Sequence, residues 1–332
     1  MPFHRRRILQ TLAALSALPA ALSSRPGLAA NKEFGDWLAE LRRDAAAQGI
    51  SRRTIDAALE SVAPIPRVLE LDRKQPESTI TFAQYVERVV SADRIAQGQQ
   101  RLAEHRDVLE RVSAQYGVPA RFVVALWGIE TSYGQITGNY KIVDALATLA
   151  YDGRRSQFFR SELIAALKIL DQGHIRPERM LGSWAGAMGQ SQFMPSSFLQ
   201  YAVDFDGDGR RDIWTSRPDV FASAANYLAK NGWNPNLTWG REVQAPPSVR
   251  NGPGTGLDAK RPLSAWQAAG VRRTNGGDLP AADVEASLVM PDGPNGAAFL
   301  VYDNYRVVMR WNRSTYFATS VGLLADRIGG AD

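Results

Sequence analysis

The sequence of 332 residues contains no cysteine. This absence excludes disulfides, thiolate nucleophiles, cysteine-ligated zinc and lipid attachment through an N-terminal cysteine. Histidine is also scarce, with three residues in all, and only His105 and His174 lie beyond the first 30 positions. Two histidines are too few for a convincing histidine metal site. Chemistry in this chain therefore has to depend on carboxylates, hydroxyls and amides.

Acidic residues are absent from the first 30 positions, which hold four arginines. Arg5, Arg6 and Arg7 precede an apolar run at 8–22, and small residues at 27–30 offer a cleavage site. The pattern predicts an export signal at 1–30, and the arginines also suit a twin-arginine signal. The apolar run is shorter than the roughly 18 residues of a membrane span, although a permanent N-terminal anchor is the alternative. We expect an exported, periplasmic protein.

Excess charge is absent from the remainder of the chain. Without the four arginines of the leader, 35 basic residues face 34 acidic ones, so the net charge falls from +5 to +1. Nothing in this balance demands a nucleic-acid partner. A hydrophobic content of 45% and a charged content of 22% are typical of a globular protein.

Helical spacing of apolar residues dominates the first half of the sequence. The expected helices are 34–48, a short one capped by Ser51, 81–116, 119–130, 142–150, 156–172, 220–230 and 314–328. Two strands, at 286–290 and 297–302, flank a segment rich in turn residues. The sequence predicts an α+β fold with a helical core and a small antiparallel sheet. We expect one catalytic domain over 31–332, whose parts are 31–118, 119–235, a β part at 236–310, and a C-terminal helix at 311–329.

Glu130 ends a strongly apolar helical run. Phe122, Leu126 and Glu130 are spaced i, i+4 and i+8, so they share one helix face. A carboxylate on an inward face is costly unless its pKa rises or it is paired. A raised pKa is what a general acid needs to keep its proton at neutral pH. The alternative is a structural glutamate paired with Arg154 or Arg155.

A glycine-rich segment at 182–197, GSWAGAMGQSQFMPSS, is the second signal. Its small residues let the backbone approach a ligand closely. Gln190, Ser191 and Gln192 supply neutral hydrogen-bonding groups, while Trp184 and other large side chains supply apolar faces. That mixture suits a sugar, which has apolar ring faces and many hydroxyls. The alternative is a buried turn at a close helix crossing.

A third signal is the acidic loop that begins at Asp204. Acids at its first, third and fifth positions (Asp204, Asp206 and Asp208) and glycine at the sixth match the start of a calcium-binding EF-hand loop. The backbone carbonyl of Arg210 would be a further ligand. The twelfth position lacks the usual glutamate, and Asp219 is the best replacement. We expect a structural calcium ion here, with a solvated turn without metal as the alternative.

These motifs occur together in one order: WGIETSYG at 127–134, AGAMGQSQFMPSS at 185–197, DFDGDG at 204–209 and RWNRS at 310–314. The combination resembles the lytic murein transglycosylase B family of bacterial cell-wall enzymes over roughly residues 33–329. The resemblance implies a lysozyme-like core with a helical and a small β subdomain. It also implies cleavage of the β-1,4 bond between N-acetylmuramic acid and N-acetylglucosamine without water, leaving 1,6-anhydromuramic acid ends.

The resemblance also implies roles for individual residues. Glu130 would be the only catalytic acid and base, and no cofactor would take part in catalysis. Ser183, Gln192 and Asn312 fall where the family places groups that contact the substrate or support catalysis. Tyr133 and Met194 would line the glycan groove. Membrane-bound members carry an acylated cysteine, which this chain lacks, so we expect no lipid anchor.

The implied partner is the peptidoglycan glycan strand, and we expect a monomer. Two other functions stay open at this point. A muramidase with the same fold would use water, helped by an aspartate, and would leave reducing ends. A peptidoglycan-binding or calcium-binding protein without activity would bind cell walls but release no soluble fragments.

Overall fold

The structure is a computed structural model that describes residues 26–74, 80–152 and 154–330. The described residues divide into two compact units, one that ends at Arg43 and one that begins at Asp44. The expected export signal lies outside the described residues, except for positions 26–30, which begin the first helix. None of the described helices is both long and apolar enough to cross a membrane.

The first unit contains most of helix α1 (Pro26–Ala47). This helix begins earlier than the expected start at residue 34. Within it, the rings of Phe34 and Trp37 stack with their centroids 5.6 Å apart.

One group of helices in the second unit packs around α9 (Ser156–Asp171). Of its other members, α2 (Arg52–Leu59), α8 (Ile142–Asp152) and α10 (Pro195–Tyr201) contact α9, and α3 (Pro66–Arg73) contacts α8. Ser51 caps α2 as expected, because its side chain accepts the backbone N–H of Thr54. The buried carboxylate of Glu162 on α9 accepts both the N–H and the hydroxyl of Ser196, which fixes α10 against α9. Neither α3 nor α10 was predicted.

The helix expected over 81–116 is wrong as a single element. The structure has α4 (Phe82–Val89), α5 (Ala92–Glu104) and α6 (Arg106–Tyr116) instead. The interruption has a local cause, because the extended Ser91 accepts the N–H of Arg94 as the N-cap of a new helix. The bend at His105 lets α5 and α6 both contact α7 (Ala120–Thr131).

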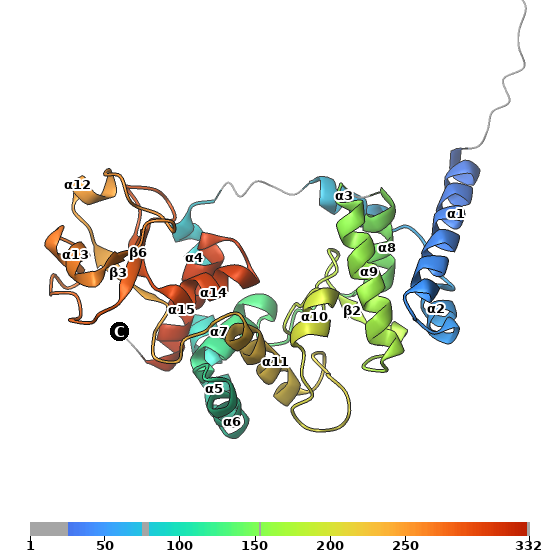
Figure 1. The fold of residues 1–332 in the computed structure, drawn as a ribbon, viewed down its shortest axis with the longest axis horizontal. Coiled ribbons are helices and arrows are strands. Elements are labelled where there is room, and N and C mark those ends of the chain that lie inside the picture. Colours follow the sequence, from blue (N-terminus) through green and yellow to red (C-terminus); the bar gives the residue numbers. More distant parts are fainter. Residues whose placement is uncertain (1–25, 75–79, 153, 331–332) are drawn as a thin grey trace, which may run out of the picture. The chain divides into compact units, whose positions relative to one another are not determined.

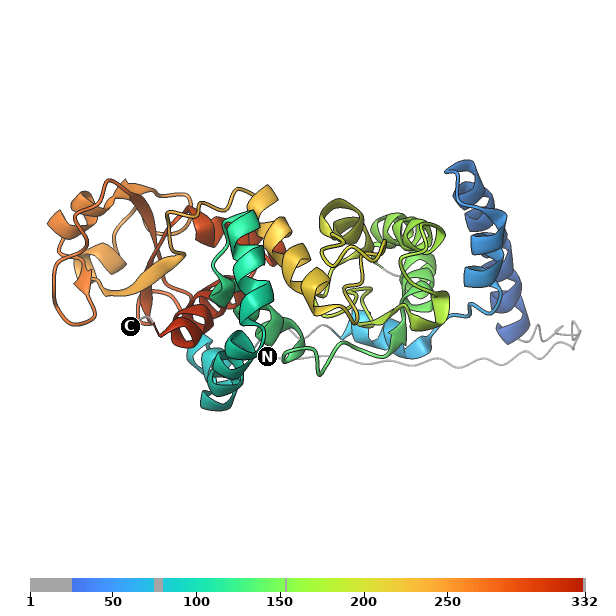
Figure 2. The ribbon, with the colours of Figure 1, turned by 90° about the horizontal axis from the view of Figure 1, so that it is seen from below.

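A second group of helices surrounds α7. It consists of α5, α6, α11 (Arg217–Lys230) and α15 (Thr315–Gly329), with α14 (Asp303–Trp311) against α15. Gly322 lets α15 lie against Trp239, since a Cβ at this position would clash with the indole ring. In both views the helices α14 and α15 (red) lie beside the β-sheet part (orange) (Figure 1, Figure 2).

The sheet of the second unit has five antiparallel strands in the order β4-β6-β7-β3-β5. They are β3 (Gly240–Gln244), β4 (Arg261–Pro262), β5 (Arg272–Arg273), β6 (Glu285–Val289) and β7 (Ala298–Val301). Short helices α12 (Pro247–Arg250) and α13 (Leu263–Ala268) accompany it, and Trp266 is fully buried in its core. A separate pair, β1 (Tyr140–Lys141) and β2 (Leu181–Gly182), joins the chain after α7 to the glycine-rich segment.

The prediction of a mainly helical α+β fold with a small antiparallel sheet is confirmed.

Candidate active site

Glu130 lies in the last turn of α7, on the same face as the buried Phe122 and Leu126. The helix ends abruptly because Ser132 and Tyr133 both have positive φ, 49° and 60°. Non-glycine residues adopt this backbone conformation rarely. The sharp turn directs the chain away immediately after the acid, so Glu130 stands at the end of a rigid buried helix.

The carboxyl group of Glu130 has an apolar environment. It lines a small cavity with side chains from α7 and α11, such as Leu126, Val220 and Phe221. Burial raises its pKa from 4.5 to about 7, and a hydrogen bond from Trp311 offsets part of the rise. Among the described residues that line this cavity, Glu130 is the only acid. The carboxyl is therefore poised to hold or release a proton near neutral pH.

Trp311 is the direct partner of Glu130. Its indole Nε1 donates to Oε1 of the carboxyl at 2.8 Å. The ring is held by Phe193 and Tyr227, with centroid distances of 5.1 and 4.7 Å. The sequence pattern predicted Asn312 in the site but not Trp311, although the same motif contains both.

Among the described residues no ion pair holds Glu130, in contrast to the alternative of a structural glutamate paired with an arginine. Arg154 donates to Asp72, and Arg155 lies over the ring of Phe159. A second missed neighbour is Tyr85 of α4, whose pKa is raised by burial and then by the charge of Glu130. No sequence motif marks Tyr85, since it lies 45 positions before the acid in another helix.

Gln190 connects the glycine-rich segment to α7. It is buried, its Oε1 accepts from Nε1 of Trp127 at 2.8 Å, and its Nε2 donates to the carbonyl of Trp214 at 2.7 Å. The hydroxyl of Thr131, next to Glu130, donates to the carbonyl of Gln190 at 3.1 Å. This network fixes the segment directly beside the acid.

The expected substrate-binding residues fall into two sets. Gln192 and Met194 flank Phe193, whose ring contacts Trp311, and Asn312 follows Trp311 directly. These three side chains are half-buried or exposed. The hydroxyl of Ser183 accepts the N–H of Ala187 at 3.0 Å, so it braces the start of the same segment.

Tyr133 does not line a groove, in contrast to the expectation from the sequence. Its side chain is 3% exposed, and its hydroxyl donates to the carbonyl of Arg94 at 2.6 Å. The ring also packs edge-on against Trp127. The positive φ of residues 132 and 133 turns this side chain inward, which a sequence pattern of non-glycine residues does not show.

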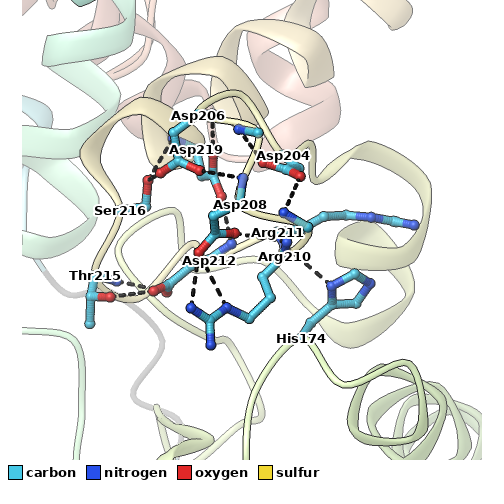
Figure 3. Close-up of polar contacts among 12 residues, drawn as sticks. His174, Asp204, Asp206, Asp208, Arg210, Arg211, Asp212, Thr215, Ser216 and Asp219 are labelled. Carbon is cyan, nitrogen blue, oxygen red and sulfur yellow. Dashed lines mark hydrogen bonds and ion pairs between the residues drawn. The ribbon is translucent and has the colours of Figure 1, made fainter.

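The acidic loop lies between α10 and α11 (Figure 3). Carboxylate oxygens of Asp204, Asp206 and Asp219 lie within 4.8 Å of one another. Asp219 is fully buried and accepts the N–H groups of Phe205 and Asp212, both at 2.7 Å. It therefore ties the loop to the start of α11.

One other expected ligand, Asp208, is placed differently. The carboxylate of Asp208 accepts from the guanidinium of Arg210 at 3.0 Å, and it is not part of the Asp204–Asp206–Asp219 cluster. Oxygen donors that are all carboxylates suit a hard divalent cation such as calcium. The three clustered carboxylates, held together without a cationic side chain among them, fit such an ion.

Comparison with known proteins settles the family. The sequence pattern of the transglycosylase SLT domain matches residues 33–326. The chain belongs to this transglycosylase family. Membrane-bound lytic murein transglycosylase B of Escherichia coli (strain K12) is 31% identical over 297 residues, which cover 84% of this chain and 79% of that protein. The protein is accordingly a lytic transglycosylase, from a family of periplasmic cell-wall enzymes.

Solved structures agree with this transglycosylase assignment. The structure of SltB3 from Pseudomonas aeruginosa in complex with NAG-anhNAM-pentapeptide is 47% identical, with a TM-score of 0.86, and the match covers 90% of this chain and 80% of that one. The Escherichia coli lytic transglycosylase Slt35 in complex with calcium is 30% identical, with a TM-score of 0.75 and coverages of 90% and 92%.

Proposed function

We propose that this transglycosylase cleaves the β-1,4 bond between N-acetylmuramic acid and N-acetylglucosamine of peptidoglycan without water, with Glu130 as its only acid and base. The observation that carries the proposal is the environment of Glu130. Glu130 is half-buried, desolvation of its carboxyl raises its pKa to about 7, and its hydrogen-bond partner among the described residues, Trp311, is a neutral donor. Such a group holds a proton near neutral pH and also releases it readily.

The first step is proton donation. Protonated Glu130 gives its proton to the glycosidic oxygen as the bond to C1 of muramic acid breaks. A hydrolase would need a second carboxylate about 5–9 Å away, as a nucleophile or base. We assign the stabilisation of C1 to the 2-acetamido group of the substrate itself, the substrate-assisted route known in other glycosidases.

The second step returns the proton. Ionised Glu130 takes the proton of the C6 hydroxyl, and the C6 oxygen attacks C1 as the acetamido group leaves it. The product is a 1,6-anhydromuramic acid end, no water is consumed, and Glu130 is again protonated. Burial keeps the carboxyl near the midpoint of its titration, which suits a group that acts in both directions.

Two segments that meet beside Glu130 would hold the glycan. We assign substrate contacts to Gln192 and Met194 on one segment and to Asn312 on the other, with Ser183 supporting the first. The contact between the rings of Phe193 and Trp311 supports this assignment, because Gln192 and Met194 flank the first ring and Asn312 follows the second. The contact therefore brings these three residues close to one another. Tyr85 is a further candidate, since its hydroxyl is within electrostatic reach of the acid.

A calcium ion in the acidic loop would be structural. Asp204, Asp206 and Asp219 would hold it, and the carboxylate of Asp208 and the carbonyl of Arg210 are the further ligands expected from the sequence. Slt35, a relative with the same fold, was solved with calcium. We also propose that residues 1–30 direct export to the periplasm, and that 31–332 form one catalytic domain.

The masses of the products test this function. Purified peptidoglycan digested by the protein should yield muropeptides with anhydro ends. A hydrolase would leave reducing ends that are heavier by one water, about 18 mass units. Finding only the heavier ends would refute the proposal in favour of a muramidase, and finding no soluble fragments would favour a binding protein.

A further inference from the structure

A second cavity of about 630 Å³ lies apart from the one that Glu130 lines. Three segments form it: the end of the loop after α7, the segment after α9, and the end of the acidic loop. Its lining residues include Thr137, Gly138, His174, Arg176, Arg179, Arg210, Asp212 and Trp214. Nothing in the proposed mechanism uses this cavity.

Arg176 and Arg179 give the cavity a strong positive charge. Arg176 precedes a 3-10 turn (Pro177–Arg179) that Arg179 ends, and residues three apart in such a turn lie on the same side, whereas the exposed Glu178 between them points elsewhere on the turn. Both are exposed, and neither guanidinium has an acidic partner among the described residues. Two unpaired guanidiniums on one side of a turn are suited to bind carboxylates.

The rest of the lining does not cancel this charge. Arg210 is paired with Asp208, and Asp212 is the one acid in the lining; it keeps its negative charge while it accepts the backbone N–H groups of Trp214 and Thr215, so Arg176 and Arg179 leave the lining with a net positive charge. His174 accepts the N–H of Arg211 at Nδ1, so its proton lies on Nε2, which is then free to donate. Figure 3 shows His174 and Thr215 on the opposite side of the acidic loop from Asp206.

The cavity borders the segment that would hold the glycan. Nε2 of Gln192 donates to the carbonyl of Thr137 at 3.1 Å. Gly138 packs so closely that a Cβ there would lie 2.7 Å from the backbone nitrogen of Ser183. A group that extends from a glycan beside Gln192 and Ser183 would therefore reach this cavity directly.

We propose that this cavity binds the carboxylates of the stem peptide that peptidoglycan carries on muramic acid. The inference rests on the proposed function. The sugar rings are largely uncharged hydroxyl and amide surfaces, whereas the peptide has free carboxylates that match Arg176 and Arg179. The exposed side of Trp214 would contact the apolar side chains of the peptide.

The test measures binding to the full-length Glu130→Gln variant by calorimetry. The ligands are a NAG-NAM-pentapeptide, the same disaccharide without peptide and with its lactyl carboxyl amidated, and the pentapeptide form with its carboxylates amidated. In this background the pentapeptide form should bind at least about tenfold more tightly than the other two. Adding Arg176→Ala and Arg179→Ala should reduce that preference to about twofold or less, and the corresponding lysine variant should keep part of it.

A matched control changes two exposed arginines of α2, Arg52→Ala and Arg53→Ala, and should keep the full preference. The inference is wrong if the Arg176/Arg179 alanine variant keeps the preference, or if it weakens binding of all three ligands equally. The product masses of the unmutated enzyme test the proposed function separately. A lytic transglycosylase with no binding preference would thus refute only the peptide site.

Discussion

The indole nitrogen of Trp311 donates to the carboxylate of Glu130 at 2.8 Å, across 181 positions of sequence. Two residues far apart in the sequence thus form one unit, an acid with a desolvated carboxyl and a neutral donor. The donor stabilises the ionised carboxylate, while burial favours the protonated form. The balance between the two effects sets the pH range in which the acid works.

Trp311→Phe separates these effects. It keeps a ring against Phe193 and Tyr227 but removes the donor, so the pKa of Glu130 should rise further. Because the protonated form is the acid that starts the reaction, activity declines as pH rises through this pKa. We expect the descending limb of kcat/KM against pH to move upward by up to about one unit, together with a lower maximum. A limb that stays in place or moves downward would show that this hydrogen bond does not tune the acid.

Glu130→Gln should stabilise the fold at alkaline pH. The pKa of Glu130 is about 7 in the folded state against 4.5 normally, so the folded protein binds a proton that the unfolded chain has already lost. Stability therefore falls as pH rises from about 4.5 to 7, by up to about 3 kcal/mol, and stays lower above that window. Glutamine has no such loss, so urea unfolding should show the variant's advantage growing from about pH 4 to pH 8. An advantage that does not change with pH would contradict the raised pKa.

Gln190→Leu should destabilise the core beside the acid. The change leaves the indole N–H of Trp127 and the carbonyl of Trp214 without their partner. We expect a loss of about 2–4 kcal/mol in the free energy of unfolding, measured by denaturant titration. Gln157→Leu, at an exposed position of α9, is the control and should cost less than about 0.5 kcal/mol. Equal losses in the two variants would mean that the Gln190 network contributes little.

Calcium should raise the thermal stability, and a chelator should remove the gain. At a hundredfold excess over Kd the gain is about 2.7 kcal/mol if the ion binds only the folded state. Asp204→Asn should weaken the response strongly. Asp208→Asn tests whether Asp208 is a calcium ligand. The variant should change the calcium response little if Asp208 remains paired with Arg210, and it should weaken the response if Asp208 binds the ion with Asp204, Asp206 and Asp219. A melting temperature that is the same with calcium and with chelator would rule out the structural role.

Much of the fold follows from local patterns in the sequence. The apolar spacing around Phe122 predicted α7 and the inward face of Glu130, and the turn-rich segment before Ala297 predicted the hairpin of β6 and β7. The breaks at Ser91 and His105 were missed because helix-forming residues continue on both sides. Strands of two residues, such as β4 and β5, carry too few side chains for an alternating pattern.

The partners of the site were harder to predict than the acid itself. Trp311 and Tyr85 reach Glu130 through tertiary packing, and no spacing rule connects residues so distant in sequence. Asp208 matched the EF-hand pattern, but Arg210 two positions later competes for its carboxylate. The sequence pattern also hid the inward turn of Tyr133, since only the backbone conformation reveals it.

The central claim is that Glu130 is the only acid and base. Its most direct test is the turnover of peptidoglycan by Glu130→Gln, beside the binding of NAG-NAM-pentapeptide to the same variant. We predict that turnover falls at least about a thousandfold while Kd changes by less than about threefold, and that Glu110→Gln on the exposed side of α6 keeps full activity. Turnover by Glu130→Gln at a tenth or more of the unmutated rate would contradict the account.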